Sequence, residues 1–180
     1  DTGYIGKWHL DNPRTPYINV KNNQGLVKWN EWTPPERRHG FDFWYAYGTY
    51  DYHNRPMYWS NEASRDSFHF VDQWGPEHET DLAINYLENK GNKYRDDEKP
   101  FALMVSMNPP HMPYGLVPEK YKLLYDEVHL DSLVQFPNIP KEGTKWGDYY
   151  RINIKNYYAM ISGIDDQLGR IMATLKSTGL

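Results

Sequence analysis

Apolar positions along the chain form short strand-like runs that are separated by long polar stretches. A strand is predicted over residues 2–6, where Tyr4 and Ile5 favour extended structure and two glycines allow close backbone approach. A second strand is predicted over residues 40–47. The run "PFALMVSM" at residues 100–107 is almost continuously apolar, which is typical of a strand buried on both faces in a helix-flanked parallel sheet.

Helical spacing appears in three other segments. Thr80 can cap a helix over residues 81–90, and Gly91 can end it. A short helix is predicted over residues 118–125. The clearest helix covers residues 149–177. Its apolar stripe, at steps of three and four, consists of Ile154, Tyr158, Ile161, Ile164, Leu168, Ile171 and Leu175. This order of strands and helices predicts an α/β layered architecture.

The remaining segments, residues 11–36, 48–78 and 130–147, are rich in proline, asparagine and charge and are predicted to be loops. Ligands of open α/β sheets bind beyond the carboxyl ends of the strands. Candidate chemistry is therefore expected where the predicted strands end.

A lysine and two histidines follow two of these strand ends. Lys7 and His9 come after the first strand, and strand alternation would point both to the same side. His111 lies in a proline-rich turn after the strand at residues 100–107. Together they would form a donor-rich pocket that suits a tetrahedral oxyanion and can protonate a leaving oxygen. The K-x-H spacing is common, so the spacing by itself also fits a structural role.

The other histidines and an aspartate pair are predicted to have structural or solvent-exposed roles. The histidines predicted to be solvated or structural are His39, His53, His69, His78 and His129. Asp165 and Asp166 are adjacent on the long predicted helix and face different directions, which favours a helix-surface role. No H-x-x-x-H or H-E-x-x-H motif and no aspartate pair at the end of a predicted strand is present, so the sequence predicts no complete metal site.

Composition narrows the possible ligands. The net charge of −4 gives no polyanion-binding signal, so nucleic acid is not expected as a partner. No apolar run reaches about 18 residues, so no membrane span is predicted. There is no cysteine, which excludes disulfides and a cysteine nucleophile within these residues. The 16 tyrosines and 7 tryptophans suit polar ligands such as sugars, although half-buried packing is their commoner use.

Three stretches resemble one known family. "TGYIGKWHL" at residues 2–10 resembles the second signature of the type I sulfatases. "FALMVSMNPPHMPY" at residues 101–114 resembles their later strand with a histidine in a P-H-x-P turn, and residues 156–180 resemble their long helix. The three matches lie in the family's order. The resemblance implies part of an alkaline-phosphatase-like sandwich, an α/β fold with a mixed, mostly parallel sheet flanked by helices.

The resemblance also implies roles for the candidate residues. Lys7 resembles the lysine that contacts the sulfate oxygens and the catalytic aldehyde hydrate. His9 resembles the histidine that hydrogen-bonds the hydroxyl of that hydrate and helps to expel sulfate. His111 resembles the histidine that binds sulfate near the ester oxygen and assists the leaving group. The family usually has glycine after "KWHL", whereas this chain has "DNPR"; Asn12 and Arg14 are candidate substrate contacts, although a reshaped loop is the favoured interpretation.

Other parts of the family's site are implied but not found in this sequence. The resemblance implies a formylglycine nucleophile in a motif N-terminal of "GKWHL", and calcium ligands on both sides of the present residues. We therefore expect residues 1–180 to be an internal portion of a single sulfatase catalytic domain, inactive without its nucleophile and metal segments. By resemblance, the parent enzyme is expected to be periplasmic or extracellular.

Three functions remain open at this point. The favoured one is hydrolysis of a small-molecule or oligosaccharide sulfate ester, with a carbohydrate as the preferred substrate class. The first alternative is a phosphodiester or phosphonate monoester hydrolase of the same superfamily. The second is a non-catalytic homologue that only binds anionic sugars.

Overall fold

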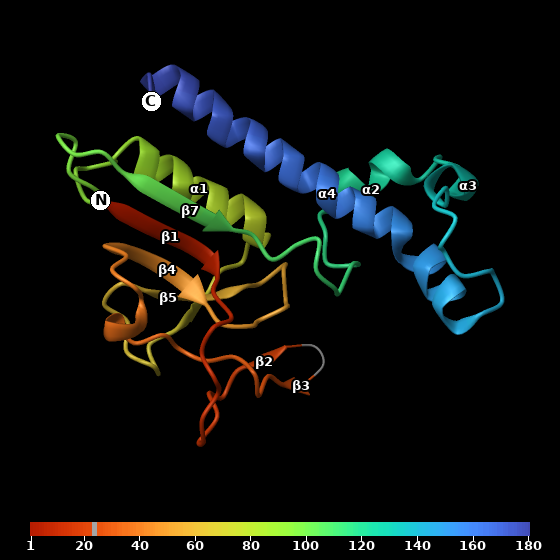
Figure 1. The fold of residues 1–180 in the computed structure, drawn as a ribbon, viewed down its shortest axis with the longest axis horizontal. Coiled ribbons are helices and arrows are strands. Elements are labelled where there is room, and N and C mark those ends of the chain that lie inside the picture. The colour runs from red at the N-terminus through yellow and green to blue at the C-terminus, as the bar shows by residue number, and fades with distance from the viewer. Residues whose placement is uncertain (23–24) are drawn as a thin grey trace.

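The computed structural model describes residues 1–22 and 25–180, and its centre is a five-stranded mixed sheet (Figure 1). The strand order is β6-β5-β4-β1-β7. The strands are β1 (Thr2–Lys7), β4 (Phe43–Tyr47), β5 (Met57–Ser60), β6 (His69–Phe70) and β7 (Ala102–Ser106). β1 runs parallel to both β4 and β7, whereas β4, β5 and β6 pair antiparallel. A separate antiparallel pair joins β2 (Lys21–Asn22) and β3 (Gly25–Leu26). The mixed α/β sheet and three predicted strands are confirmed.

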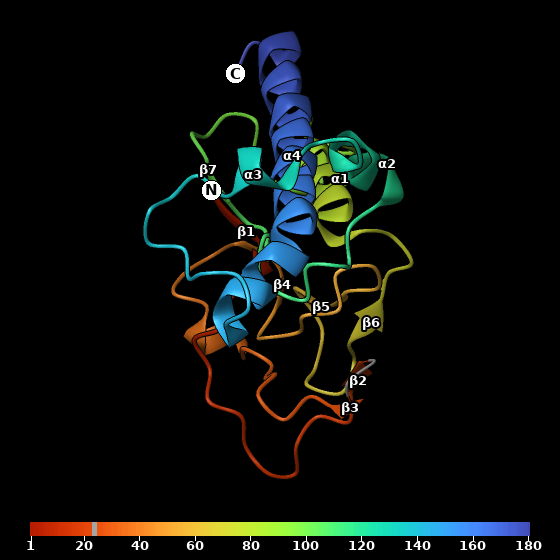
Figure 2. The same ribbon diagram turned by 90° about the vertical axis from the view of Figure 1, so that its right-hand side faces the viewer.

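Helices lie against the β1–β7 side of this sheet. α1 (Gly75–Leu87) packs on β1 and β7, and α4 (Lys145–Thr178) packs on α1. The N-terminal half of α4 extends beyond the sheet, where it meets the short helices that follow β7 (Figures 1 and 2). The short helical segments are η1 (Pro35–Arg37), α2 (Glu119–Lys122), η2 (Leu123–Tyr125) and α3 (Leu130–Leu133). The predicted helices over residues 118–125 and 149–177 are confirmed.

The predicted start of the first helix is wrong. α1 begins at Gly75, and Pro76 occupies its first turn, where a fixed φ and a missing N–H group suit a helix start. Thr80 is fully buried inside the helix and does not cap it. The helix ends at Leu87, and Gly91 follows in the next turn with a φ of +72°.

All three predicted loops contain regular structure, and the segment over residues 11–36 includes β2, β3 and the start of η1. The segment over residues 48–78 includes β5, β6 and the first turn of α1, and the segment over residues 130–147 includes α3 and the start of α4. α4 begins early because Thr144 caps it: the Thr144 hydroxyl accepts a hydrogen bond from the Gly147 amide at 3.2 Å.

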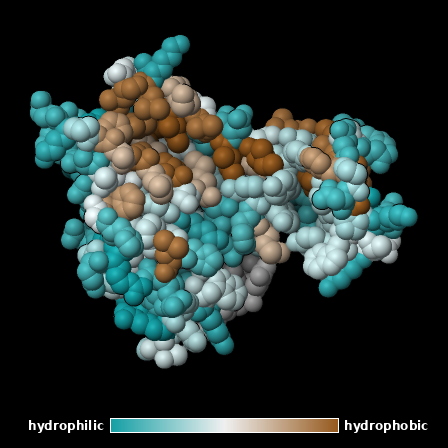
Figure 3. Space-filling model, viewed as in Figure 1, coloured by the Kyte–Doolittle hydropathy of each residue, from teal (hydrophilic) through white to brown (hydrophobic). Residues whose placement is uncertain are grey.

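Within the described residues, β7 is not buried on both faces as predicted, and only Ile154 of the predicted stripe on α4 is buried. Met104 of β7 is 54% exposed and Leu168 of α4 is 52% exposed. α4 instead buries Met160, Gly163 and Gln167. A Cβ on Gly163 would lie 2.6 Å from the Trp74 ring, so a small residue is needed for this packing. Hydrophobic residues consequently gather on the surface over α4 and β7 (Figure 3).

The core beneath β4 and β5 holds an acidic side chain. Glu79 of α1 is 1% exposed and accepts a hydrogen bond from the Tyr58 hydroxyl at 3.0 Å. Burial raises the pKa of Glu79 to about 8, although the bond from Tyr58 opposes the shift. Glu79 is therefore mostly protonated at neutral pH.

Although α4 has 34 residues, no helix in the part of the chain that the structure describes has both the length and the apolar character needed to cross a membrane.

Candidate active site

Three parallel strands end at one edge of the sheet, and the candidate side chains follow them there. The loops after β4, β1 and β7 emerge next to one another, as the arrowheads in Figure 1 show. Gly6 sets the spacing of β1 and β7: its φ is +109°, and a Cβ would lie 2.2 Å from the Ser106 carbonyl oxygen. Only glycine fits at this position, so the close approach of the two backbones fixes the position of the next residue, Lys7.

Lys7 is the centre of a largely buried polar cluster. Its Nζ donates to Asn108 Oδ1 at 2.9 Å and lies 3.3 Å from Asp51 Oδ1. Asn108 Nδ2 donates to the same Asp51 oxygen at 2.9 Å. Burial opposes ionisation of Asp51, but the Asn108 hydrogen bond and the charge of Lys7 outweigh it and hold the pKa of the carboxyl below its usual value. An ammonium group has three N–H donors, and two are used here, so the third can bind a ligand.

His111 approaches the same carboxylate from the loop after β7. Its Nδ1 lies 2.6 Å from the Met112 carbonyl oxygen and 3.7 Å from Asp51 Oδ1. Because a carbonyl can only accept, Nδ1 carries the proton, and Nε2 is left to exchange a proton with a ligand. The imidazole is 48% exposed and therefore accessible. The structure thus brings Lys7 and His111 together, as the sequence predicts.

A second histidine holds the His111 loop from beneath. His53 is 2% exposed, and its Nε2 donates to the His111 carbonyl oxygen at 2.9 Å. Burial lowers the pKa of His53 to about 4, so the ring is neutral near pH 7. The His111 amide donates to the Asn108 carbonyl at 3.1 Å. These two bonds fix the backbone from which His111 projects.

His9 lies apart from this cluster. β1 ends at Lys7, and His9 has a φ of +56°, so the predicted strand alternation does not extend to it. Trp8 lies between Lys7 and His9 in the sequence. The Trp8 amide donates to the Tyr47 carbonyl at 2.8 Å, and the Trp8 ring packs edge-on against the Tyr4 ring. Trp8 anchors the K-W-H segment. His9 is exposed and makes no hydrogen bond or ion pair with the described residues. Its catalytic role stays a prediction.

The segment after "KWHL" is held by a buried acid. Asp11 is buried and pairs with Arg37, and the Arg14 amide donates to Glu31 Oε2 at 3.1 Å. These contacts give the segment a structural role. The side chains of Asn12 and Arg14 are exposed, and their contact with substrate stays a prediction.

Two residues of the site, Asp51 and Asn108, were not predicted from the sequence. His53 was predicted to be solvated or structural, and its hydrogen bond to the His111 carbonyl is a structural role. Asn108 comes two residues after β7, and Asp51 comes four residues after β4. Both are therefore polar residues just beyond a strand's carboxyl end, which is the signal that could have found them. His53 carries no such signal, because its role depends on a backbone contact 58 residues away.

Calcium, which the resemblance implies, has no binding cluster here. Within residues 1–22 and 25–180, no group of three or more histidine, aspartate, glutamate or cysteine side chains is placed to hold a metal ion.

The whole chain matches the model of one protein family, Sulfatase, over residues 1–180. We call the group formed by Lys7, Asp51, Asn108 and His111 the strand-end site. The fold and this site fit that match, and the chain belongs to the sulfatase family. It is 38% identical to the endo-4-O-sulfatase of Bacteroides thetaiotaomicron over 188 residues and 33% identical to the ulvan-active sulfatase of Formosa agariphila over 183 residues. Both alignments cover 100% of this chain.

The fold is also that of a solved sulfatase. The crystal structure of the yidJ sulfatase from Bacteroides fragilis superimposes with a TM-score of 0.89 at 56% identity, over 99% of this chain and 38% of that one. The chain spans 35% and 30% of the lengths of the two relatives named above. These 180 residues therefore correspond to about a third of such a protein.

Proposed function

We propose that the protein containing this chain hydrolyses sulfate esters of carbohydrates, with Lys7 and His111 acting on the ester sulfate. The observation that carries the proposal is that Lys7 Nζ and His111 Nδ1 meet one oxygen of Asp51, at 3.3 and 3.7 Å, beyond the carboxyl ends of parallel strands. Membership of the sulfatase family supports the reaction. The names of an endo-4-O-sulfatase and an ulvan-active sulfatase among the relatives support a carbohydrate substrate.

Lys7 binds the sulfate group. Two of its N–H groups are held by Asp51 and Asn108, so the ammonium is oriented before the substrate arrives. The third N–H donates to a sulfate oxygen. A preorganised donor of this kind stabilises the negative charge that spreads over the oxygens in the transition state.

His111 protonates the leaving group. When the bond between sulfur and the ester oxygen breaks, the imidazolium Nε2 gives its proton to that oxygen and releases a sugar hydroxyl. The Met112 carbonyl and the Asp51 carboxylate hold the Nδ1–H and stabilise the charged ring. His9 is proposed to assist the later expulsion of sulfate, and Asn12 and Arg14 to contact the sugar.

The remaining parts of the site are proposed from the family resemblance. A formylglycine outside these residues supplies the nucleophile, and calcium bound outside them supplies positive charge. Residues 1–180 are accordingly proposed to be an internal portion of one catalytic domain that is inactive by itself. The same resemblance supports a periplasmic or extracellular location.

The test uses the complete protein that contains this chain. We expect it to release sulfate from a sulfated oligosaccharide and from an activated aryl sulfate faster than phosphate from an aryl phosphodiester. Lys7→Ala should lower kcat by about 10²–10³-fold, the usual cost of removing one oxyanion donor. Lys28→Ala, at an exposed lysine, is the matched control.

The outcomes separate the three functions. Preference for the phosphodiester supports the phosphohydrolase alternative. Binding of sulfated sugar without turnover supports the non-catalytic homologue. Wild-type turnover in the Lys7→Ala variant contradicts the role assigned to Lys7.

A further inference from the structure

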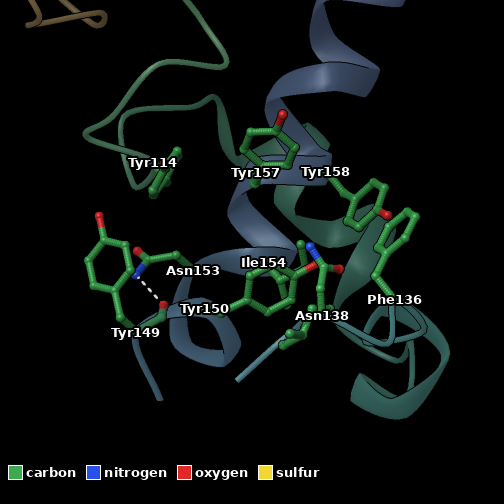
Figure 4. Close-up of a pocket in the computed structure, with 10 residues that line it drawn as sticks. Tyr114, Phe136, Asn138, Tyr149, Tyr150, Asn153, Ile154, Tyr157 and Tyr158 are labelled. Atoms are coloured by element: carbon green, nitrogen blue, oxygen red, sulfur yellow. Dashed lines mark hydrogen bonds between the residues drawn. The ribbon is translucent and has the colours of Figure 1, made fainter. Parts of the chain in front are cut away.

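A second candidate ligand site lies between α4 and the loops packed on it. A pocket of about 440 Å³ opens there, and six of its ten lining residues come from α4 (Figure 4). Six are aromatic: Tyr114, Phe136, Tyr149, Tyr150, Tyr157 and Tyr158. The other four are two asparagines and two isoleucines, so no charged side chain lines the pocket. We call this the tyrosine pocket.

The pocket is open and has a fixed wall. Phe136 is 62% exposed and Tyr149 is 38% exposed, so these rings are not packed into a core. The Tyr114 ring meets the Tyr157 ring edge-on at a centroid distance of 5.7 Å, and Tyr158 stacks on Tyr125 at 5.9 Å. These contacts hold the Tyr114, Tyr157 and Tyr158 rings in place around the hollow (Figure 4).

The lining combines apolar ring surface with polar tips. Asn138 and Asn153 lie in the lining among the tyrosine hydroxyls, and Asn153 Nδ2 donates to the Tyr149 carbonyl at 2.8 Å. Burial, together with the neighbouring Tyr149 and Tyr157, raises the pKa of Tyr114, so it remains a neutral hydroxyl. Rings with hydrogen-bonding groups at their edges suit a ligand that has both C–H faces and hydroxyl groups, which is the chemistry of a sugar ring.

The pocket lining has no charged side chain, which favours uncharged sugars over anionic ones. A sulfate or carboxylate group that enters a partly desolvated pocket needs a cationic partner, and none of the ten lining residues can supply one. Two basic side chains of the same helix stand next to lining residues, and both have other partners. Arg151 donates to the Pro140 and Gly147 carbonyls, and Lys155 donates to the Asp126 carbonyl. An uncharged ring therefore fits the pocket better than a sulfated ring or a uronic acid.

The tyrosine pocket and the strand-end site share a loop. Tyr114 comes three residues after His111, so their Cα atoms can be no more than about 11 Å apart. The end of this loop is anchored, because Trp74 Nε1 donates to the Leu116 carbonyl at 3.1 Å and Val117 is buried against α4. The two sites are therefore neighbours along one anchored loop.

We propose that the tyrosine pocket binds an uncharged sugar residue of the same saccharide whose sulfate ester lies at Lys7 and His111. The inference rests on the proposed function, which assigns the sulfate ester to Lys7 and His111. It makes the enzyme selective for chains that carry an unsulfated, non-acidic residue near the sulfated one.

The test compares two substrates on the complete protein. One is an activated aryl sulfate, and the other is a sulfated oligosaccharide with an unsulfated neutral residue beside the sulfated one. In Tyr157→Ala, the ratio of kcat/KM for the oligosaccharide to kcat/KM for the aryl sulfate should fall about tenfold, through KM. Tyr157→Phe keeps the ring and should restore most of that ratio. Trp29→Ala, at an aromatic residue 51% exposed outside the pocket, should not change it.

An unchanged ratio in a folded Tyr157→Ala variant overturns the proposal, and so does a Tyr157→Phe variant as impaired as Tyr157→Ala. Binding of the desulfated oligosaccharide, measured by calorimetry, separates this proposal from the proposed function. If the wild type binds it and Tyr157→Ala does not, the subsite stands even without sulfatase activity. If the wild type hydrolyses sulfate esters but does not bind the desulfated chain, only the subsite is lost.

Discussion

The strand-end site and the tyrosine pocket are proposed to recognise a ligand by opposite means. At the strand ends, Lys7, Asp51 and His111 present charge, and the backbone of three parallel strands fixes their positions. In the tyrosine pocket, uncharged rings from one helix and two loops present shape and hydrogen-bonding edges. Charge recognition needs short, fixed distances, because a Coulomb interaction and a charge-assisted hydrogen bond both weaken quickly with displacement. A rigid sheet supplies such distances, whereas an aromatic pocket tolerates small shifts of its walls.

The largest effect is expected where the sheet itself is disturbed. Gly6→Ala places a Cβ 2.2 Å from the Ser106 carbonyl oxygen at a φ of +109°, so β1 and β7 must separate. We expect a loss of at least about 3 kcal/mol of stability and of all activity that depends on Lys7. Thermal unfolding of the complete protein measures this. Gly169→Ala, at a helical glycine with open space around it, is the control and should be neutral or stabilising.

Removing the proposed acid should cost the next most. His111→Ala is expected to lower kcat by about 10²–10⁴-fold on an ester with a poor leaving group. Its melting temperature should change little, because the imidazole is 48% exposed. His129→Ala, at a histidine 82% exposed, is the matched control. Near-normal turnover in His111→Ala would contradict the assignment of acid catalysis to the strand-end site, which is what distinguishes it chemically from the tyrosine pocket.

The pKa of Glu79 is raised, whereas the pKa of Asp51 is lowered, so the two carboxyl groups should affect stability with opposite dependence on pH. The pKa of Glu79 is about 8 in the folded chain against an ordinary 4.5, so the folded state binds more protons between these values. Stability should therefore fall as pH rises from about 4.5 to about 8, by a few kcal/mol at most. Melting temperatures at pH 5 and pH 8 measure the slope. Glu79→Gln should flatten it, and an equal slope in both proteins would show that Glu79 is not the group responsible.

The smallest effect is expected at the edge of the strand-end site. Arg14 is exposed, and a solvated charge contributes little to binding, so Arg14→Ala should raise KM for a sulfated saccharide by about twofold to fivefold and leave kcat unchanged. The increase should shrink at high salt. If KM does not change at any salt concentration, "DNPR" only shapes the loop.

Features set by local sequence were predictable. The strand before Lys7, the strand before His111 and the long C-terminal helix each follow from a continuous run of residues, and the structure has all three. The proximity of Lys7 and His111, which both lie within 4 Å of Asp51 Oδ1, followed from a general rule, since parallel strands place their carboxyl ends at one edge.

Features set by distant contacts were not predictable. Met104 is exposed because α1 packs on the opposite face of β7 and the described residues leave the Met104 face uncovered, and α4 turns Gly163 inward because the Trp74 ring packs there. Neither neighbour can be read from the local pattern. The tyrosine pocket was missed for the same reason: Tyr158 and Ile154 were placed in a packing stripe, although they also line a hollow that residues 114 and 136–139 complete.

The central position of β1 has a consequence for biosynthesis. Phe43 and Leu103, the residues that flank Gly3 in the register, lie 40 and 100 residues further along the chain. At a translation rate of about 5–20 residues per second, the second neighbour of β1 is made roughly 5–20 s after β1 itself. During that interval one edge of β1 has no partner from β7, and pairing of such sequence-distant strands is intrinsically slow. The pairing of β1 with β7 therefore cannot begin until more than half of these 180 residues have been made.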